Sequence, residues 1–447
     1  MKNIIVIGGV AAGMSCAAKL HRESKDVDIT VYEMGKEISY GACGLPYYIG
    51  DVVSDSDQLI IKRPEDFITE RFDIKIMHQV MKVNPVTKTV VVRDLKSGVE
   101  FEKSYDQLVV ASGASPIQPD FMKKRIKNVF VLRDIPDGEQ IKKVAMDKRI
   151  RNVAIIGGGY IGLELAESFS NLGKNVTVIN RSENIMKTFD SEIRAILLDE
   201  LHRNGIELHL NDEVEELIID EQDHVQGVKT TDGLYPADLV VVAIGVRPAT
   251  SFLEGTGIEM LSNDAIIVNE RLESSIKDIY AIGDCATIYH RVLHENTHIP
   301  LATYANKQGR ILGEILAGKK TTFPGGLGAS VVKIFDLTLS QVGINEKQAI
   351  SHEFDFDTVF VKGYDHASYY PNNTPVHIKY IFDKATHVLL GAQMVGKQGV
   401  AHRIDALSIV IDKAMTLEEL ALSDFVYSPP FSGPWDPMQV AANVAKK

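Results

Sequence analysis

The feature that most constrains the fold of this chain is a repeated unit of apolar strand, glycine-rich turn and helix. One copy spans residues 4–20 and the other spans residues 153–172, and their first glycines, Gly8 and Gly157, are 149 residues apart. Each copy is followed by a second apolar strand and, later, by an apolar strand that ends in small residues. Apolar strands that alternate with helices are typical of parallel sheets buried on both faces. The repeat therefore predicts an α/β chain with two doubly wound dinucleotide-binding domains.

Length, charge and cysteine usage limit the other possibilities. At 447 residues the chain is long enough for two to four domains. Its net charge of −12 argues against nucleic acid as a partner, because phosphate binding needs a basic surface. No apolar run is long enough to span a bilayer, so we expect no membrane insertion. The three cysteines have no paired spacing, which favours a reducing, cytoplasmic setting.

The first glycine-rich turn follows a strand and opens a helix. It reads Gly8-Gly9-Val10-Ala11-Ala12-Gly13. Such a turn lets the backbone approach a pyrophosphate, whose charge then lies at the N-terminus of the helix. Val10 replaces the middle glycine of the usual pattern, but Glu33 ends the second strand, where a carboxylate accepts hydrogen bonds from a ribose. We expect a dinucleotide here.

The second turn matches the glycine pattern in full. It reads Gly157-Gly158-Gly159-Tyr160-Ile161-Gly162. Its second strand ends at Asn180, followed by Arg181, so no carboxylate repels a 2′-phosphate and an arginine is placed to pair with one. This favours NADPH over NADH. The alternative is that both are ordinary polar turn residues and that both nicotinamide cofactors are used.

A third motif is an apolar strand, residues 275–284, that ends in Gly283-Asp284. The three motifs in this order resemble those of the pyridine nucleotide-disulfide oxidoreductase superfamily, over essentially the whole chain. The resemblance implies FAD on the first unit, NAD(P)H on the second, and a C-terminal α+β domain through which the protein forms a homodimer. The expected boundaries are residues 1–114 and 247–322 for FAD, 115–246 for NAD(P)H, and 323–447 for dimerisation.

The resemblance also implies which further residues contact the cofactors. For FAD these are Ala111, Ser112, Gly113, Asp284 and Ala302; for NAD(P)H they are Gly157, Gly159, Tyr160, Ile161, Gly162, Glu164, Asn180, Arg181 and Gly245. Tyr160 is expected to be a gate over the flavin, although simple core packing is the alternative. Glu164 is expected near the nicotinamide, and the alternative is an exposed helical charge.

Cys43 lies in the run Ser39-Tyr40-Gly41-Ala42-Cys43-Gly44-Leu45-Pro46-Tyr47. Members with a redox disulfide carry a second cysteine five residues on, where this chain has Tyr48. The run therefore resembles the single-cysteine branch, which holds coenzyme A-disulfide reductases, NADH oxidases and NADH peroxidases. We expect the amide dipoles of a turn or helix start to lower the pKa of Cys43. Cys16 and Cys285 are expected to be core residues.

Three features favour the coenzyme A-disulfide reductases within that branch. Ala11 stands where the oxidases and peroxidases typically have histidine, and residues 366–371 and 426–431 resemble two segments of the reductases. The resemblance implies that Tyr369 and Tyr427 reach Cys43 from the partner subunit. It further implies that coenzyme A is bound by Ser15, Lys19, Arg22, Ser39, Arg71 and Asn306. Ala42 and Asn306 depart from residues found in some relatives, and His402 and Arg403 are expected to make structural contacts.

The expected function is reduction of coenzyme A disulfide by NAD(P)H through FAD, with coenzyme A held on Cys43 as a mixed disulfide. One alternative reduces oxygen to water through a Cys43 sulfenic acid. Another reduces a coenzyme A persulfide or a polysulfide. A flavin-bound redox sensor that changes its partner surface with the state of Cys43 is a further alternative. No histidine has a spacing that indicates a metal site, so we predict no metal.

Overall fold

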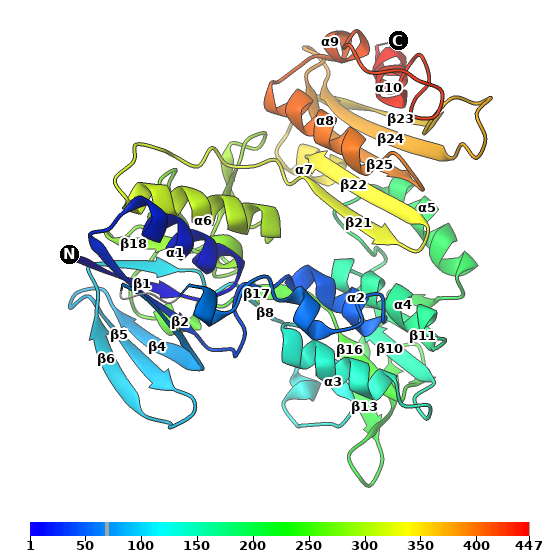
Figure 1. The fold of residues 1–447 in the computed structure, drawn as a ribbon. Coiled ribbons are helices and arrows are strands. Elements are labelled where there is room, and N and C mark those ends of the chain that lie inside the picture. Colours follow the sequence, from blue (N-terminus) through cyan, green and yellow to red (C-terminus); the bar gives the residue numbers. More distant parts are fainter. Residues whose placement is uncertain (68–70, 447) are drawn as a thin grey trace.

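The computed structural model describes residues 1–67 and 71–446 of the chain. Three domains are visible, each built around its own large sheet (Figure 1). The N-terminal and central domains have parallel sheets, and the C-terminal domain has an antiparallel one. This is the predicted α/β class with an added α+β domain.

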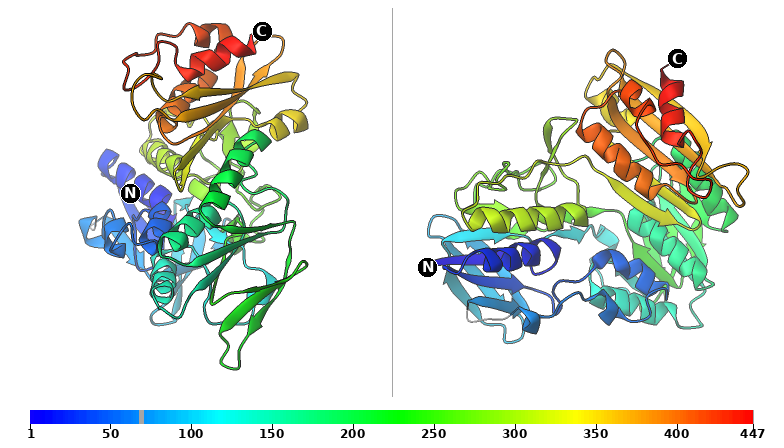
Figure 2. Two further views of the ribbon diagram at one scale, coloured as in Figure 1. Left: turned by 90° about the vertical axis from the view of Figure 1, so that its right-hand side faces the viewer. Right: turned by 45° about the horizontal axis from the view of Figure 1, so that its top comes forward.

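The N-terminal domain holds a parallel sheet in the order β18-β7-β1-β2-β3. Its strands are β1 (Lys2–Ile7), β2 (Val27–Glu33), β3 (Phe72–Ile76), β7 (Gln107–Val110) and β18 (Ile279–Ala281). Helices α1 (Ala11–Glu23) and α6 (Ala302–Leu316) lie side by side against it (Figures 1 and 2). A Cβ at Gly309 would lie 2.4 Å from the Ala12 carbonyl oxygen, so glycine allows this close approach.

The central domain repeats the arrangement with the strand order β12-β11-β10-β16-β9. Its strands are β9 (Val129–Val131), β10 (Asn152–Ile156), β11 (Asn175–Asn180), β12 (Glu207–Leu210) and β16 (Leu239–Val242). Its helices are α3 (Ile135–Ala145), α4 (Tyr160–Asn171) and α5 (Ser191–Arg203). The short helix α2 (Leu45–Ile49) comes from the N-terminal part of the sequence but packs on α3 and α4.

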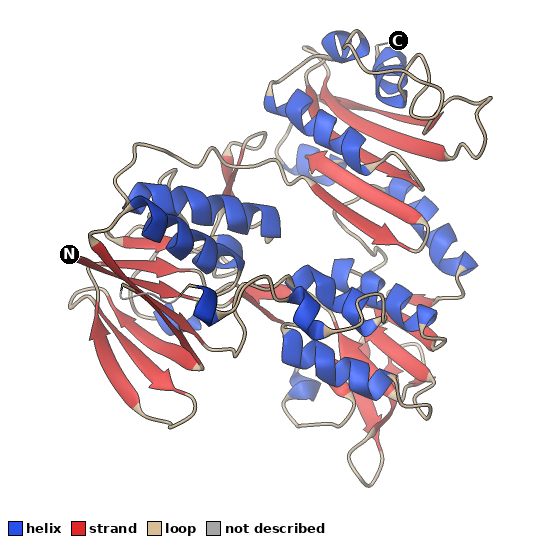
Figure 3. Cartoon of the chain, viewed as in Figure 1, coloured by secondary structure: helices blue, strands red, loops and turns tan. Residues whose placement is uncertain are grey.

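The C-terminal domain is an antiparallel sheet in the order β21-β22-β25-β24-β23. Its strands are β21 (Ser330–Ile334), β22 (Leu337–Gly343), β23 (Phe356–Tyr364), β24 (Pro375–Asp383) and β25 (Leu389–Gly396). Its helices are α7 (Glu346–Ser351), α8 (Ala401–Asp412), α9 (Leu417–Ala421) and α10 (Pro437–Ala445). Helices α8 and α10 pack on the sheet and bury its main core (Figure 3).

Smaller antiparallel elements were not predicted from the sequence. They are β4 (His78–Asn84) with β5 (Thr89–Asp94) and β6 (Glu100–Ser104); β13 (Val214–Ile219) with β14 (Val225–Thr230) and β15 (Leu234–Pro236); β8 (Ala114–Pro116) with β17 (Val246–Pro248); and β19 (Ile288–His290) with β20 (Glu295–Thr297). Where β8 and β17 pair, the chain passes between the N-terminal and central domains.

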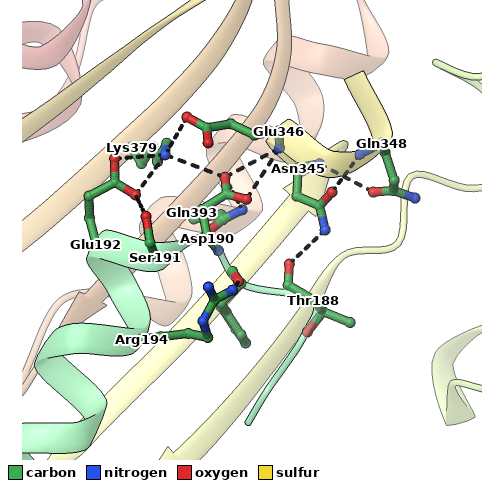
Figure 4. A network of polar contacts seen from close by, with 11 residues as sticks. Thr188, Asp190, Ser191, Glu192, Arg194, Asn345, Glu346, Gln348, Lys379 and Gln393 are labelled. Atoms are coloured by element: carbon green, nitrogen blue, oxygen red, sulfur yellow. Dashed lines mark hydrogen bonds and ion pairs between the residues drawn. The ribbon is translucent and has the colours of Figure 1, made fainter. Parts of the chain in front are cut away.

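A buried lysine connects the C-terminal domain to the central domain (Figure 4). The Nζ of Lys379, on β24, lies 2.7 Å from a Glu192 oxygen and 2.6 Å from Glu346 Oε1. Gln393 donates a hydrogen bond of 2.9 Å to Asp190, and Asn345 donates one of 3.1 Å to the carbonyl of Thr188. Lys379 is fully buried, and the carboxylates of Asp190, Glu192 and Glu346 balance its charge, so the contact fixes α5 against the sheet.

Candidate active site

Cys43 lies in a one-turn 3-10 helix, Ala42–Gly44, that runs directly into α2. The helix is held down by Leu45 and Ile49, which are buried in the core of the central domain. A Cβ at Gly44 would come within 2.4 Å of Leu59 Cδ2, so a larger residue there would displace the Leu59 side chain. The thiol of Cys43 remains exposed, whereas Cys16 and Cys285 are buried as predicted.

The expectation of a lowered pKa at Cys43 is wrong. Partial burial raises the pKa of the thiol, and the negative charges of Glu164 and Asp284 raise it further. A backbone amide lowers the pKa, but this contribution is too small to outweigh burial and the two carboxylates. The chain itself therefore favours the protonated thiol at Cys43.

Glu164 is brought to Cys43 through Tyr47, which sequence reasoning did not single out. Tyr47 lies four residues after Cys43 on the same helical segment, and its hydroxyl donates a hydrogen bond of 3.4 Å to Glu164 Oε1. Ser168 fixes α4 against α2 by donating a bond of 2.8 Å to the carbonyl of Pro46. Burial raises the pKa of Glu164 to about 7, so its charge changes near neutral pH.

Replacing Glu164 with glutamine is expected to lower the pKa of Cys43, because a negative charge beside the thiolate is removed. The pH profile of Cys43 alkylation by iodoacetamide should therefore shift to lower pH, with several-fold faster labelling at neutral pH. Glu221→Gln, at an exposed turn, is the control and should leave the profile unchanged. A profile that stays in place in Glu164→Gln would contradict the coupling.

The first glycine-rich turn has the geometry of a dinucleotide cradle. Gly8 has a φ of +103°, and a Cβ there would lie 2.2 Å from the Ala111 carbonyl oxygen. A Cβ at Gly13 would lie 1.9 Å from the Gly8 carbonyl oxygen. No side chain caps the N-terminus of α1 at Val10, so the first amides of the helix are available to a phosphate.

Polar groups around this cradle fit a flavin dinucleotide. The carboxylate of Glu33 accepts bonds from the backbone of Gly9 (2.6 Å) and Gly35 (2.7 Å), at the end of β2 where a ribose would lie. Asp284 follows β18, and burial raises its pKa. The buried hydroxyl of Ser112 has no hydrogen-bond partner among the described residues. An unpaired buried hydroxyl and a desolvated carboxylate beside the turn are groups that a bound polar ligand would satisfy.

The remaining residues predicted for FAD border the same cradle. Ala111 follows β7, Gly113 has a φ of +68°, and Ala302 begins α6. Their contact with a flavin stays a prediction.

The second turn repeats the geometry of the first. Gly157 has a φ of +115°, a Cβ there would lie 2.4 Å from the Ala243 carbonyl oxygen, and a Cβ at Gly162 would lie 2.0 Å from the Gly157 carbonyl oxygen. Asn180 takes the place that Glu33 has in the first turn, since its Oδ1 accepts a bond of 3.2 Å from Gly158. The strand end thus offers an amide instead of a carboxylate.

Arg181 follows Asn180 and is exposed, with its guanidinium 3.5 Å from Glu213 Oε1. Gly245, with a φ of +124°, lies beyond the end of β16 in the same domain. Ile161 is the second residue of α4. A 2′-phosphate would have to displace the Glu213 carboxylate from Arg181, and the preference for NADPH stays a prediction.

Tyr160 begins α4 and is tied to the C-terminal domain. Its hydroxyl shares hydrogen bonds with Thr188 Oγ1 (3.1 Å) and Ser330 Oγ (3.3 Å), and it accepts one from Gln341 (3.3 Å). These hydrogen bonds satisfy the hydroxyl and hold the side chain against the C-terminal domain. Its role as a gate stays a prediction.

Four of the residues predicted to bind coenzyme A are placed as follows. Ser15 on α1 donates a bond of 2.9 Å to Asn306 on α6, so these two lie together. Arg22 is exposed on α1. Ser39 has a φ of +48°, and its amide donates a bond of 3.0 Å to the Gly9 carbonyl.

The other two cationic candidates have partners within the chain. Lys19 pairs with Glu23 at 2.6 Å and with Glu314 at 2.7 Å, and these hydrogen bonds raise its pKa. Its charge is thereby balanced, which argues against a direct role with phosphate. Arg71 donates a hydrogen bond to the carbonyl of Lys25, in the turn that follows α1.

Tyr369 and Tyr427 lie on two loops of the C-terminal domain and meet each other. Their hydroxyls are 2.8 Å apart, and this hydrogen bond raises the pKa of Tyr369. Both rings are open to solvent, with 71% and 48% of their surfaces exposed. In the described part of the chain, no hydrogen bond connects either tyrosine to Cys43, and their approach to Cys43 from a partner subunit stays a prediction.

The profile of the family described as pyridine nucleotide-disulphide oxidoreductase matches residues 2–309, and the profile of its dimerisation domain matches residues 329–438. The chain belongs to this oxidoreductase family. The resemblance drawn from the sequence motifs is therefore confirmed at the level of the family.

Three similar members of the family act on different acceptors. The NAD(P)H coenzyme A polysulfide/persulfide reductase of Pyrococcus horikoshii is 35% identical over 100% of this chain and 98% of its own length. The coenzyme A disulfide reductase of Staphylococcus haemolyticus is 35% identical over 98% of this chain and 97% of its own. The structure of the water-forming NADH oxidase from Lactobacillus brevis, bound to NADH, is 30% identical, with a TM-score of 0.95 over 100% and 98% of the chains.

Within residues 1–67 and 71–446, no group of three or more histidine, cysteine, aspartate or glutamate side chains is arranged to hold a metal ion. None of the helices in these ranges has the length and apolar character needed to cross a membrane.

Proposed function

We propose that this oxidoreductase reduces coenzyme A disulfide to two coenzyme A thiols at the expense of NAD(P)H. The observation that carries the proposal is the lone exposed thiol of Cys43, placed near the FAD cradle with no other exposed cysteine in the described chain. A flavoprotein disulfide reductase without its own second cysteine needs the substrate to supply the second sulfur. A coenzyme A thiol meets that need.

The proposed cofactor arrangement follows the two glycine-rich turns. Residues 1–114 and 247–322 would hold FAD, residues 115–246 would hold NAD(P)H, and residues 323–447 would join two subunits in a homodimer. Bound FAD supplies the electron path from NAD(P)H to the sulfur chemistry. Glu33 would hold the ribose of FAD, Asp284 its ribityl chain, and the start of α1 its pyrophosphate.

The sulfur chemistry balances at Cys43. Its thiolate attacks one sulfur of the coenzyme A disulfide, the substrate S–S bond breaks, and a Cys43–S–S–coenzyme A bond forms as one coenzyme A thiolate leaves. Two electrons from NAD(P)H then cleave the mixed disulfide into the Cys43 thiolate and the second coenzyme A thiolate. Two protons complete the products. Glu164, which changes charge near neutral pH beside Cys43, governs how readily the thiolate forms.

The leaving thiolates need a proton donor, and the Tyr369–Tyr427 pair of the partner subunit is proposed for this role. A hydrogen-bonded pair of phenols can give one proton while the second hydroxyl stabilises the phenolate left behind. Coenzyme A would lie along α1 and α6, where Ser15 and Asn306 meet and Arg22 is exposed, with Ser39 and Arg71 nearby in the proposed channel. The three unpaired cysteines suit a reducing, cytoplasmic setting.

The proposal is tested by intact mass spectrometry of the reduced protein after exposure to coenzyme A disulfide. The expected result is a gain of one coenzyme A thiol per subunit, lost again with dithiothreitol and absent from Cys43→Ser. A protein whose mass does not change would contradict the mixed-disulfide mechanism.

Reduction of coenzyme A persulfide or polysulfide is a second candidate. It is favoured because the Pyrococcus horikoshii persulfide reductase and the Staphylococcus haemolyticus coenzyme A disulfide reductase are each 35% identical to this chain. The same Cys43 thiol and the same coenzyme A channel would serve it. The two candidates differ in product, because a persulfide releases hydrogen sulfide and the disulfide does not.

We further propose that Arg181 gives a preference for NADPH. Arg181→Ala is expected to raise the KM for NADPH about tenfold or more, since a charge-assisted hydrogen bond contributes about 1.5–3 kcal/mol. The KM for NADH and both kcat values should hardly change. Arg149→Ala, an exposed arginine that pairs with Asp147, is the matched control in steady-state assays with each cofactor. An equal change in both KM values would argue that Arg181 does not contact the 2′-phosphate.

A further inference from the structure

Arg403 is a buried charge in the C-terminal domain, on α8, with 8% of its surface exposed. Its Nε donates hydrogen bonds to both carboxylate oxygens of Asp436, at 3.2 Å and 2.9 Å. Its Nη1 donates to the Gly399 carbonyl at 2.9 Å, and its Nη2 donates to the carbonyls of Asp365 (2.8 Å) and Phe431 (3.4 Å). One guanidinium therefore holds three separate segments of backbone.

Two of those segments carry the tyrosine pair. The carbonyl of Asp365 is four residues before Tyr369, and that of Phe431 is four residues after Tyr427. The two loops also touch directly, through a backbone bond of 3.3 Å from Ala367 to a proline carbonyl and through the two phenol hydroxyls. Arg403 thus ties the loops together from the buried side, while the tyrosines meet on the exposed side.

The carboxylates next to Arg403 shape each loop separately. Asp365 accepts hydrogen bonds from the backbone and the hydroxyl of Thr374, both at 2.8 Å, and so closes the loop that holds Tyr369. Asp436 accepts from Ser432 at 3.1 Å and from Met438 at 2.9 Å, and so fixes the end of the other loop at the start of α10. Each loop is therefore closed by its own hydrogen bonds, and Arg403 sets the distance between the two loops.

We propose that Arg403 is a positioning residue that sets the geometry of the Tyr369–Tyr427 pair for the acceptor half of the reaction, an inference that rests on the proposed function. Arginine is required because its planar fork reaches the Asp436 carboxylate and three carbonyls at once. Lysine keeps the charge but is a single point donor on a flexible stem. The substitution Arg403→Lys therefore changes the geometry more than the charge.

The test measures the two half-reactions of Arg403→Lys separately. Anaerobic bleaching of the flavin by NADPH should keep its wild-type rate, and kcat with coenzyme A disulfide should fall about tenfold to a hundredfold with little change in the KM for NADPH. Arg291→Lys is the matched control, since Arg291 pairs with Asp412 at the other end of α8, and it should keep wild-type kinetics. Equal losses in both half-reactions of Arg403→Lys would mean a general structural defect and would overturn the proposal.

A second arm asks whether Arg403 acts through the tyrosines. In a Tyr369→Phe/Tyr427→Phe background, adding Arg403→Lys should cost less than about twofold in kcat, because residues that act through one another are not additive. The same fold-loss in both backgrounds would overturn the proposal. Thr374→Val removes a hydrogen bond from the Tyr369 loop alone and replaces Arg403→Lys if that variant does not fold. It should lower kcat with coenzyme A disulfide by a smaller factor and leave flavin reduction unchanged. Wild-type kinetics in Thr374→Val would count against the proposal.

A readout independent of coenzyme A separates this proposal from the proposed function. Tyrosine ionisation is followed by ultraviolet absorbance, with the double phenylalanine variant as the reference for the two phenols. Arg403→Lys should change the titration of the pair even if the wild-type protein proves inactive on coenzyme A disulfide. An unchanged titration would overturn the positioning role, and an inactive wild type with a changed titration would reject only the proposed function.

Discussion

Cys43→Ser should abolish reduction of coenzyme A disulfide, with a loss of at least about a thousandfold in kcat, because removing the nucleophile of a covalent mechanism has effects of this size or larger. Serine keeps the shape of the side chain, but its hydroxyl neither ionises near neutral pH nor forms a disulfide. Flavin content and anaerobic bleaching by NADPH should stay at wild-type levels, since residue 43 is not among the residues proposed to hold either nucleotide. The loss in kcat is measured as the rate of coenzyme A thiol release, with a colorimetric thiol reagent.

Cys16→Ala is the control for this variant. Cys16 is fully buried in α1, and burial raises its pKa far out of the reactive range, so its removal should leave turnover unchanged. Turnover above about a tenth of wild type in Cys43→Ser would contradict a covalent role for the thiol.

The second large effect is expected from removing both hydroxyls of the tyrosine pair. Tyr369→Phe/Tyr427→Phe should lower kcat with coenzyme A disulfide about a hundredfold, the lower range for loss of a general acid. Flavin reduction by NADPH should not change. Tyr364→Phe, another exposed tyrosine at the end of β23, is the control and should behave as wild type. Stopped-flow measurement of both half-reactions separates these outcomes.

Mixing subunits tests whether the pair acts across the dimer. When Cys43→Ser and double phenylalanine subunits are refolded together, each mixed dimer has one site with an intact thiol and intact tyrosines from the other chain. About a quarter of wild-type activity should then return, because half of the dimers are mixed and each has one working site of two. No recovered activity would place the tyrosines and the thiol in the same subunit.

The sequence was sufficient for the parts of the fold that depend on local pattern. Gly8 and Gly157 marked both nucleotide turns because each adopts a positive φ and lies against a backbone carbonyl, a constraint that only glycine meets. Strand β11 ends at Asn180 as expected, and β2 ends at Glu33. Strand β6 was missed because all of its residues are exposed and it lacks the alternation of a half-buried strand.

The site was harder to predict because its electrostatics depend on distant residues. Cys43 was identified from its own surroundings, but its pKa is raised by burial in the folded chain and by Glu164 and Asp284, far along the sequence. Glu164 was expected near the nicotinamide, but nothing in the sequence indicated that its charge would act on Cys43. Arg403 was expected to make structural contacts, but its partners could not be named because they lie on loops that the sequence does not bring together.

The central claim is that Cys43 passes the electrons of NADPH to a coenzyme A disulfide. The most direct measurement is an anaerobic assay with coenzyme A disulfide as the sole acceptor, in which the thiols released and the NADPH oxidised are both counted. Parallel assays measure oxygen uptake in air and hydrogen sulfide release from coenzyme A persulfide. The account predicts two coenzyme A thiols for each NADPH, at a rate well above that with oxygen. Rapid oxygen consumption in air with no thiol release from the disulfide would contradict it.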